Sequence, residues 1–183
     1  MGEEQSALII IDAQRDFLDG NGPYARRHTG TASMQRTAGR LGRIVKQPPV
    51  PVIVVFSHYR PDQFGDGLSL CIRDTHGAEP ALEFPEDMPT FVKHEHSAFA
   101  CDRLVQYLVD KKIKRLYLAG FLIEYCVRAT AFDALKAGFD VVVIEDLVDT
   151  ADDVQQRKEA TIRELREAGI MSCRSTHMIE AIL

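Results

Sequence analysis

Short apolar runs alternate with amphipathic segments along the whole chain. Six runs of four to seven residues predict strands buried in a sheet: residues 7–11, 50–56, 90–93, 115–120, 140–146 and 170–173. Between and after them, apolar residues recur at three- and four-residue steps, which predicts helices: residues 32–46, 98–112, 126–137, 152–168 and 176–183. This alternation predicts an α/β fold, a doubly wound, six-stranded, mainly parallel sheet with helices on both faces in three layers of the Rossmann type.

The chain contains no internal repeat and no linker between its elements. A length of 183 residues is typical of one domain, which we expect to span residues 1–183. Two long polar segments interrupt the pattern, at residues 13–30 and 57–89. Loops of this size inside a compact domain are usually functional, so we expect them to form the walls of a binding site.

Composition and charge exclude several classes of function. The net charge is −5 and no basic stripe is present, which argues against a nucleic-acid partner. No apolar run approaches the roughly 20 residues that a membrane span requires. The N-terminal residues lack the basic segment of a secretory signal, and the four cysteines show no CxxC pairing. We therefore expect a cytoplasmic protein with reduced thiols and no membrane partner.

Three chemically capable side chains follow predicted strands. Asp12 ends the run ALIIID, Lys93 ends TFVK, and Cys126 follows RLYLAG at the start of a predicted helix. Each has an ordinary explanation: a turn-capping carboxylate, a solvated lysine and a small buried hydrophobe. In a parallel sheet, however, the carboxyl ends of the strands share one edge, where open α/β sheets place their active sites. Their joint position favours a functional site.

An acid, an amine and a thiol at one edge are suited to acyl transfer. The carboxylate of Asp12 can accept the thiol proton, and the ammonium of Lys93 favours both the carboxylate and the thiolate. A helix N-terminus at Cys126 would favour the thiolate further. We therefore predict attack by Cys126 on a carbonyl, loss of an amine and hydrolysis of a thioester by water that Asp12 activates.

Three segments resemble the isochorismatase-like cysteine hydrolases, a superfamily that includes nicotinamidases and N-carbamoylsarcosine amidases. The segments are ALIIIDAQRDFLDG, FVKHEHSAF and GFLIEYCVRATAFDALKAGFDVVVIED. The resemblance covers nearly the whole chain and implies a triad of Asp12 as base, Lys93 as electrostatic partner and Cys126 as nucleophile. It also implies an oxyanion hole formed by the backbone amides of Leu122 and Cys126, with a cis peptide bond between Phe121 and Leu122.

The sequence departs from the nicotinamidase pattern at the metal ligands. Those enzymes carry an Asp-x-His pair after the second strand and a further His downstream. Here His58 and Arg60 fall at the positions of the pair, and Leu70 falls at that of the last histidine. Leucine cannot bind a metal, and arginine stays protonated. We therefore expect no metal ion. No GxGxxG follows the first strand, so we expect no dinucleotide or other cofactor.

Four residues are candidates for contact with the substrate. We expect Phe17 and Tyr125 to form apolar walls, although packing in the core would also explain them. His58 leaves the second strand toward the predicted site, and Arg60 would bind a carboxylate or another polar group of the substrate. Ile123 stands where many members of the superfamily have threonine, which removes a hydroxyl near the oxyanion turn.

The sequence thus predicts a metal-independent amidohydrolase that cleaves a small amide-like C–N bond. We expect its partners to be a small-molecule substrate and further copies of itself, as a dimer or tetramer. One alternative is an isochorismatase-type vinyl ether hydrolase, which needs no thiol and is therefore disfavoured by Cys126. The other alternative is a non-catalytic binding or scaffold protein, which the complete triad disfavours.

Overall fold

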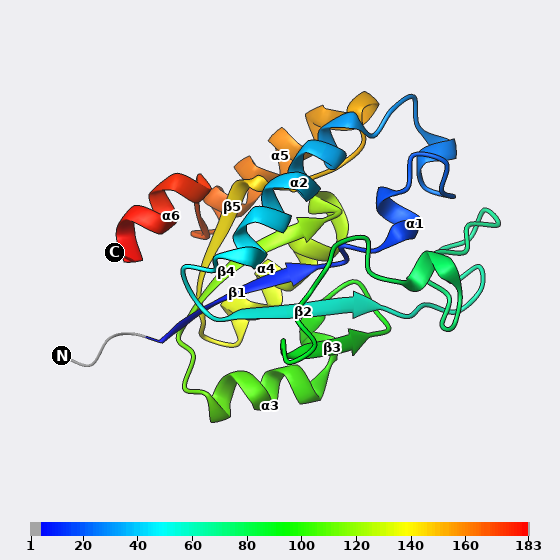
Figure 1. The fold of residues 1–183 in the computed structure, drawn as a ribbon. Helices are drawn as coiled ribbons and strands as arrows, with labels where there is room; N and C mark the ends of the chain where they lie inside the picture. Colours follow the sequence, from blue (N-terminus) through cyan, green and yellow to red (C-terminus); the bar gives the residue numbers. More distant parts are fainter. Residues whose placement is uncertain (1–4, 183) are drawn as a thin grey trace.

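The computed structural model describes residues 5–182, arranged around one six-stranded sheet (Figure 1). The strands are β1 (Ser6–Ile11), β2 (Val52–Ser57), β3 (Thr90–Lys93), β4 (Arg115–Phe121), β5 (Asp140–Asp149) and β6 (Met171–Cys173). Their order across the sheet is β3-β2-β1-β4-β5-β6, and all five pairings are parallel. From β1 the following strands are added first on one side, to β3, and then on the other, from β4 to β6. Open α/β sheets form a crevice at their carboxyl edge where the strand order reverses in this way. The predicted fold class is confirmed.

Six α-helices accompany the sheet in the described part of the chain. They are α1 (Arg15–Leu18), α2 (Ala32–Lys46), α3 (Asp102–Asp110), α4 (Arg128–Lys136), α5 (Gln155–Glu167) and α6 (Ser175–Ile182). Shorter turns precede several of them: η1 (Ala25–Arg27), η2 (His76–Ala78), η3 (Ala98–Ala100), η4 (Ile123–Val127) and η5 (Asp152–Val154). The predicted last helix reached residue 183, which lies outside the described residues, as do residues 1–4 of the predicted domain.

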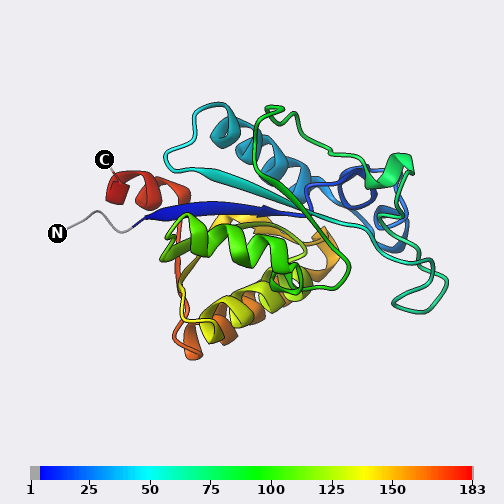
Figure 2. The ribbon, with the colours of Figure 1, turned by 90° about the horizontal axis from the view of Figure 1, so that it is seen from below.

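The helices cover both faces of the sheet because successive strand residues point to opposite sides. On one face, Leu8 and Ile10 of β1 belong to a buried cluster with α1, α2 and α6. On the other face, Ile9 and Ile11 belong to a cluster with α3, α4 and α5. Figure 2 shows these two layers on either side of the strands. Apolar residues on both faces explain why β1 reads as a continuous hydrophobic run.

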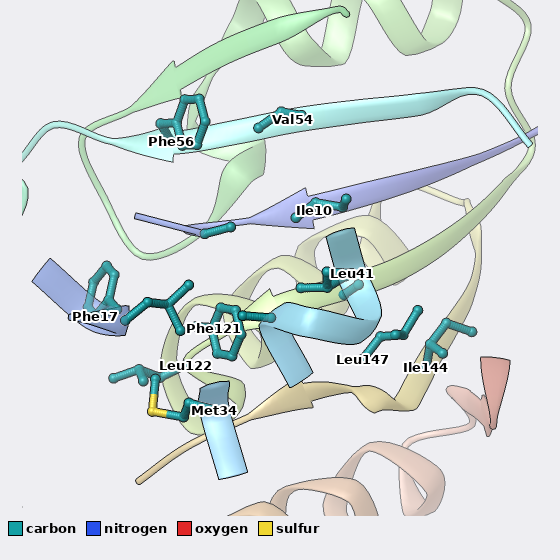
Figure 3. Close-up of a cluster of buried hydrophobic side chains, with 14 of the residues drawn as sticks. Ile10, Phe17, Met34, Leu41, Val54, Phe56, Phe121, Leu122, Ile144 and Leu147 are labelled. Carbon is teal, nitrogen blue, oxygen red and sulfur yellow. The ribbon is translucent and has the colours of Figure 1, made fainter. Parts of the chain in front are cut away.

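The first of these clusters extends to the carboxyl edge of the sheet. Figure 3 shows part of it, with Met34 and Leu41 of α2 packed among side chains of the strands. Phe17 of α1 and Leu122, directly after β4, lie at the end of this cluster. The core therefore holds the segments that follow β1 and β4 in fixed positions.

Candidate active site

The three residues at the ends of strands meet at one point. Asp12 follows β1, Lys93 ends β3, and Cys126 lies in η4 shortly after β4. Lys93 Nζ lies 2.9 Å from Asp12 Oδ2 and 3.5 Å from Cys126 Sγ. All three residues are buried, with exposed fractions of 0% to 3%. The lysine ammonium therefore bridges the carboxylate and the thiol.

Unusual backbone at the ends of β1 and β4 shapes this site. Asp12 adopts a left-handed conformation with φ of 54°, which aspartate tolerates better than most residues. Gly120 has φ of 114° and passes so close to β1 that an added Cβ would lie 1.9 Å from the carbonyl oxygen of Ile11. Only glycine permits this approach. The close contact brings the segment after β4 toward Asp12.

The segment that carries Cys126 differs from the predicted helix. The peptide bond between Phe121 and Leu122 is cis. Residues Ile123–Val127 then form a π-helical turn, in which the amide of Val127 donates to the carbonyl of Leu122 at 3.2 Å. The α-helix begins only at Arg128. The prediction that Cys126 occupies the first turn of an α-helix was therefore wrong, because the chain inserts a wider turn of the kind that often marks functional sites.

Two hydroxyl groups from the β2 segment complete the site, and neither was predicted to contact the triad. Ser57 Oγ donates to Asp12 Oδ1 at 2.8 Å and accepts from Lys93 Nζ at 2.6 Å. The hydroxyl of Tyr59 lies 2.9 Å from Lys93 Nζ and 3.4 Å from Cys126 Sγ. No sequence signal marked them, because the pairing of Ser57 with Lys93 across β2 and β3 is visible only in the structure. A residue two positions further along an extended chain points to the same side.

A buried glutamine fixes the end of β2. The side chain of Gln14 accepts from the amide of Ser57 at 2.7 Å and donates to the carbonyl of the same residue at 2.9 Å. It also donates to the carbonyl of Ala78 at 2.8 Å. These bonds satisfy backbone groups that would otherwise be costly to bury. Gln14 therefore positions Ser57, and with it the acceptors around Lys93.

A stack of three rings lies beside the sulfur. His96 Nδ1 is 3.7 Å from Cys126 Sγ. The imidazole stacks on Phe64 with ring centroids 4.6 Å apart and on Tyr125 with centroids 5.6 Å apart. Phe64 and Tyr125 are partly exposed, so the stack lies at the solvent side of the thiol. The structure thus places His96 against the predicted nucleophile.

Burial and neighbouring charges act in opposite directions on the pKa values of Cys126 and Lys93. Burial raises the pKa of Cys126 to about 12, and the positive charge of Lys93 lowers it only in part. Burial alone would lower the pKa of Lys93, but the charges of Asp12 and Cys126 raise it above its ordinary value. The resting site therefore contains a neutral thiol beside an ammonium ion. The thiol proton must leave as the sulfur attacks, and Asp12 is the nearby carboxylate that can take it.

A cavity of about 450 Å³ opens onto the thiol. Its apolar wall includes Phe17, Tyr59, Leu68, Leu70, Leu122 and Tyr125. His28 also lines it, while Arg27 and Arg157 add positive charge and Asp66 adds negative charge. Phe17 and Tyr125 thus occupy the positions expected of substrate-contacting residues, and their roles remain predictions.

His58 and Arg60 are not among the residues that line this cavity. The reason is the alternation of side chains beyond the end of β2, where Tyr59 still forms a bridge with Ile72. Because Ser57 and Tyr59 point to the triad, His58 and Arg60 point away from it. Arg60 is exposed. The expectation that these two residues face the pocket is therefore corrected, and Arg27 and Arg157 supply the guanidinium groups there.

The described residues do not form a metal site of the kind that zinc uses. Within residues 5–182, no group of three or more His, Cys, Asp or Glu side chains could hold a metal ion. The cavity wall near the thiol instead contains the phenol of Tyr59, which is bonded to Lys93, and the side chain of Leu70. Neither provides the imidazole, thiolate or carboxylate ligands that zinc requires.

None of the helices in residues 5–182 is long and apolar enough to cross a membrane. The cytoplasmic location and the oligomeric state stay predictions.

Comparison with known proteins identifies the family of the chain. Residues 6–176 match the family model of the isochorismatase domain. The chain belongs to the isochorismatase family. This confirms the resemblance on which the triad assignment was based, and it makes the protein a hydrolase related to amidases.

Three relatives illustrate the range of the family. The nicotinamidase/pyrazinamidase of Mycobacterium tuberculosis is 27% identical, over 90% of this chain and 96% of its own. A probable inactive nicotinamidase of Arabidopsis thaliana is 26% identical, over 90% of both chains. The structure of the pyrazinamidase of Pyrococcus horikoshii in complex with zinc is 27% identical and has a TM-score of 0.79, over 93% of this chain and 99% of that one. The family thus includes amidases and a member named as probably inactive.

Proposed function

We propose that this protein hydrolyses a small amide-like C–N bond through a thioester on Cys126, without a metal ion. One observation carries the proposal: Lys93 Nζ lies within 3.5 Å of Cys126 Sγ and 2.9 Å of Asp12 Oδ2. A buried base, cation and thiol in this arrangement have the parts that nucleophilic catalysis requires. Relatives named as amidases support the choice of an amide as substrate.

The reaction proceeds in two steps that use the same three residues. As Cys126 Sγ bonds to the carbonyl carbon, its proton passes to Asp12, and the amides of Leu122 and Cys126 stabilise the oxyanion. The C–N bond then breaks, and the nitrogen leaves as an amine with the proton from Asp12. Water next attacks the thioester while Asp12 takes its proton. The carboxylic acid is released, and the sulfur regains a proton from Asp12.

The cavity indicates what kind of amide would fit. Its volume of about 450 Å³ is within the range of small-molecule sites. Apolar walls favour a compact, partly apolar acyl group. Arg27 and Arg157 line the same cavity, and guanidinium groups bind carboxylates through paired hydrogen bonds. We therefore expect amides that also carry an anionic group to be better substrates than neutral amides of equal size.

The test is a screen of small amides with wild-type protein and with Cys126→Ala. Nicotinamide, N-carbamoyl amino acids and half-amides of dicarboxylic acids would be assayed for release of ammonia or amine, with and without a chelator. We expect turnover by the wild type to be unaffected by the chelator and to be lost in Cys126→Ala. Cys173→Ala is the matched control, because this thiol lies on β6, at the edge of the sheet opposite to β3 and Lys93.

Each alternative predicts a different result from this screen. Full amide turnover by Cys126→Ala would exclude the thioester mechanism. Turnover of a vinyl ether that persists in the same variant would support the isochorismatase-type reaction, which needs no thiol. Loss of activity on chelation would overturn the metal-free mechanism. If no amide or vinyl ether is turned over and Cys126 reacts with an alkylating agent no faster than the other cysteines, the non-catalytic alternative would be favoured.

A further inference from the structure

The ammonium of Lys93 divides its hydrogens among more neighbours than it can serve, and the sulfur of Cys126 is one of them. Lys93 Nζ has three hydrogens but four oxygen acceptors: Asp12 Oδ2 at 2.9 Å, Ser57 Oγ at 2.6 Å, Tyr59 OH at 2.9 Å and the carbonyl of Glu95 at 3.1 Å. The sulfur is a fifth neighbour, at 3.5 Å, within the range of a hydrogen bond to sulfur. A thiolate therefore has the positive charge of Lys93 beside it but only a share of its hydrogens.

Tyr59 occupies a position from which a further hydrogen bond to the sulfur can come. An ammonium group can only donate, so Tyr59 accepts from Lys93 and keeps its own hydrogen for a neighbour. Cys126 Sγ lies 3.4 Å from the phenol oxygen. Resting on the proposed function, we propose that the hydroxyl of Tyr59 donates a hydrogen bond to the sulfur of Cys126 and stabilises its thiolate during catalysis.

The surroundings of Tyr59 and Cys126 agree with Tyr59 as the donor of this hydrogen bond. Burial and the negative charge of Asp12 raise the pKa of Tyr59 far above its ordinary value, so the phenol keeps its proton. The same hydrogen bond lowers the pKa of Cys126, against the effect of burial. His96 is the other neighbour of the sulfur, at 3.7 Å, and its ring nitrogen is a donor in only one of the two neutral tautomers. Lys93, Asp12 and Tyr59 act on the pKa of the thiol, and His96 contacts the sulfur.

The stabilisation has a measurable size. A hydrogen bond to a charged group contributes about 1.5–3 kcal/mol. Since 1.4 kcal/mol corresponds to a factor of ten in an equilibrium constant, the thiolate population should fall by about 10- to 100-fold without this hydroxyl. No proton leaves Tyr59 in this role. It is a positioning and stabilising donor, and Asp12 remains the base.

The test is the rate at which iodoacetamide alkylates Cys126 in the full chain, followed by mass spectrometry of its peptide across pH. Tyr59→Phe keeps the ring that packs against Phe64 at a centroid distance of 4.7 Å and removes only the hydroxyl. We expect alkylation about 10- to 100-fold slower at pH 8 and at every pH below the pKa of the thiol. Tyr107→Phe, the same change on α3, is expected to leave rate and profile unchanged.

The outcomes separate this inference from the proposed function. A wild-type rate and pH profile in Tyr59→Phe, with the fold verified by circular dichroism, would overturn the role of Tyr59. The proposed function would survive that result as long as Cys126→Ala still abolishes amide turnover. A Tyr107→Phe variant slowed as much as Tyr59→Phe would also contradict the inference, since the loss would then not depend on the hydroxyl beside the sulfur.

Discussion

Lys93 Nζ lies 2.9 Å from Asp12 Oδ2, and neither side chain is accessible to solvent. Removing one member of such a buried pair leaves an uncompensated charge, which typically costs about 3–5 kcal/mol. We therefore predict that Lys93→Met lowers the free energy of unfolding by this amount, measured by urea denaturation at pH 7. Activity should be lost as well, because the thiolate loses its neighbouring cation.

The double variant Asp12→Leu with Lys93→Met is the control for this prediction. It removes both charges, so most of the stability should return while activity stays absent. A single Lys93→Met variant as stable as the wild type would contradict the prediction. That result would mean that the carboxylate of Asp12 tolerates burial with Ser57 as its remaining partner.

Two glycines with positive φ allow a test of the close approach between β1 and β4. Gly120→Ala would place a Cβ 1.9 Å from the carbonyl oxygen of Ile11, whereas Gly138→Ala would meet no atom within 4 Å. Both carry the strain of a left-handed residue, about 1 kcal/mol. We predict that Gly138→Ala loses about this much stability in thermal unfolding and that Gly120→Ala loses more than about 4 kcal/mol or fails to fold. Equal losses would show that the strands can separate without cost.

Much of the fold could be predicted from the sequence because strand positions follow from local composition. The apolar runs at 7–11 and 115–120 lie within the observed β1 and β4. A parallel sheet then brings residues such as Asp12 and Lys93 to one edge, whatever the length of the loops between them. The identity of the triad members came from this rule together with the resemblance of their flanking segments to one family.

The residues around the triad could not be predicted because they depend on long-range geometry. Tyr59 lies beyond the end of β2, and its direction depends on a bridge to Ile72. His96 is placed by its stacking on Phe64, from the loop after β2, and on Tyr125, from η4. No periodic pattern records such contacts. The dependence of side-chain direction on such contacts also explains why the prediction that His58 and Arg60 face the pocket was wrong.

Arg157 offers a test of the expected preference for anionic substrates. Its guanidinium lines the cavity and lies 3.8 Å from Glu124 Oε1, with nearly half of the side chain exposed. We predict that Arg157→Gln raises KM for amides that carry a carboxylate by about 10-fold or more, equivalent to one charged hydrogen bond, with little change in kcat. Neutral amides should be affected less. Steady-state kinetics on a matched pair of substrates would measure this difference.

Arg163→Gln is the matched control, because Arg163 lies on the same helix, α5, and is not among the residues that line the cavity. It should leave both substrates unaffected. An equal rise in KM for charged and neutral amides in Arg157→Gln would mean that Arg157 shapes the cavity without recognising charge.

His96 should make the stability of the protein depend on pH between neutrality and mild acid. Burial lowers the pKa of His96 below its ordinary value, and the positive charge of Lys93 lowers it further, while Asp12 and Glu95 oppose this. The unfolded chain therefore binds this proton at a higher pH than the folded protein does. The stability that the neutral ring contributes is complete above about pH 6.5 and is lost as the pH falls below that value.

We predict that His96→Gln loses less free energy of unfolding between pH 7 and pH 5 than the wild type does, measured by urea denaturation at each pH. His177→Gln, a change at an exposed position on α6, should keep the wild-type slope. If His96→Gln also keeps that slope, then protonation of His96 is not what weakens the fold in mild acid, and the charged ring must be accommodated beside Lys93.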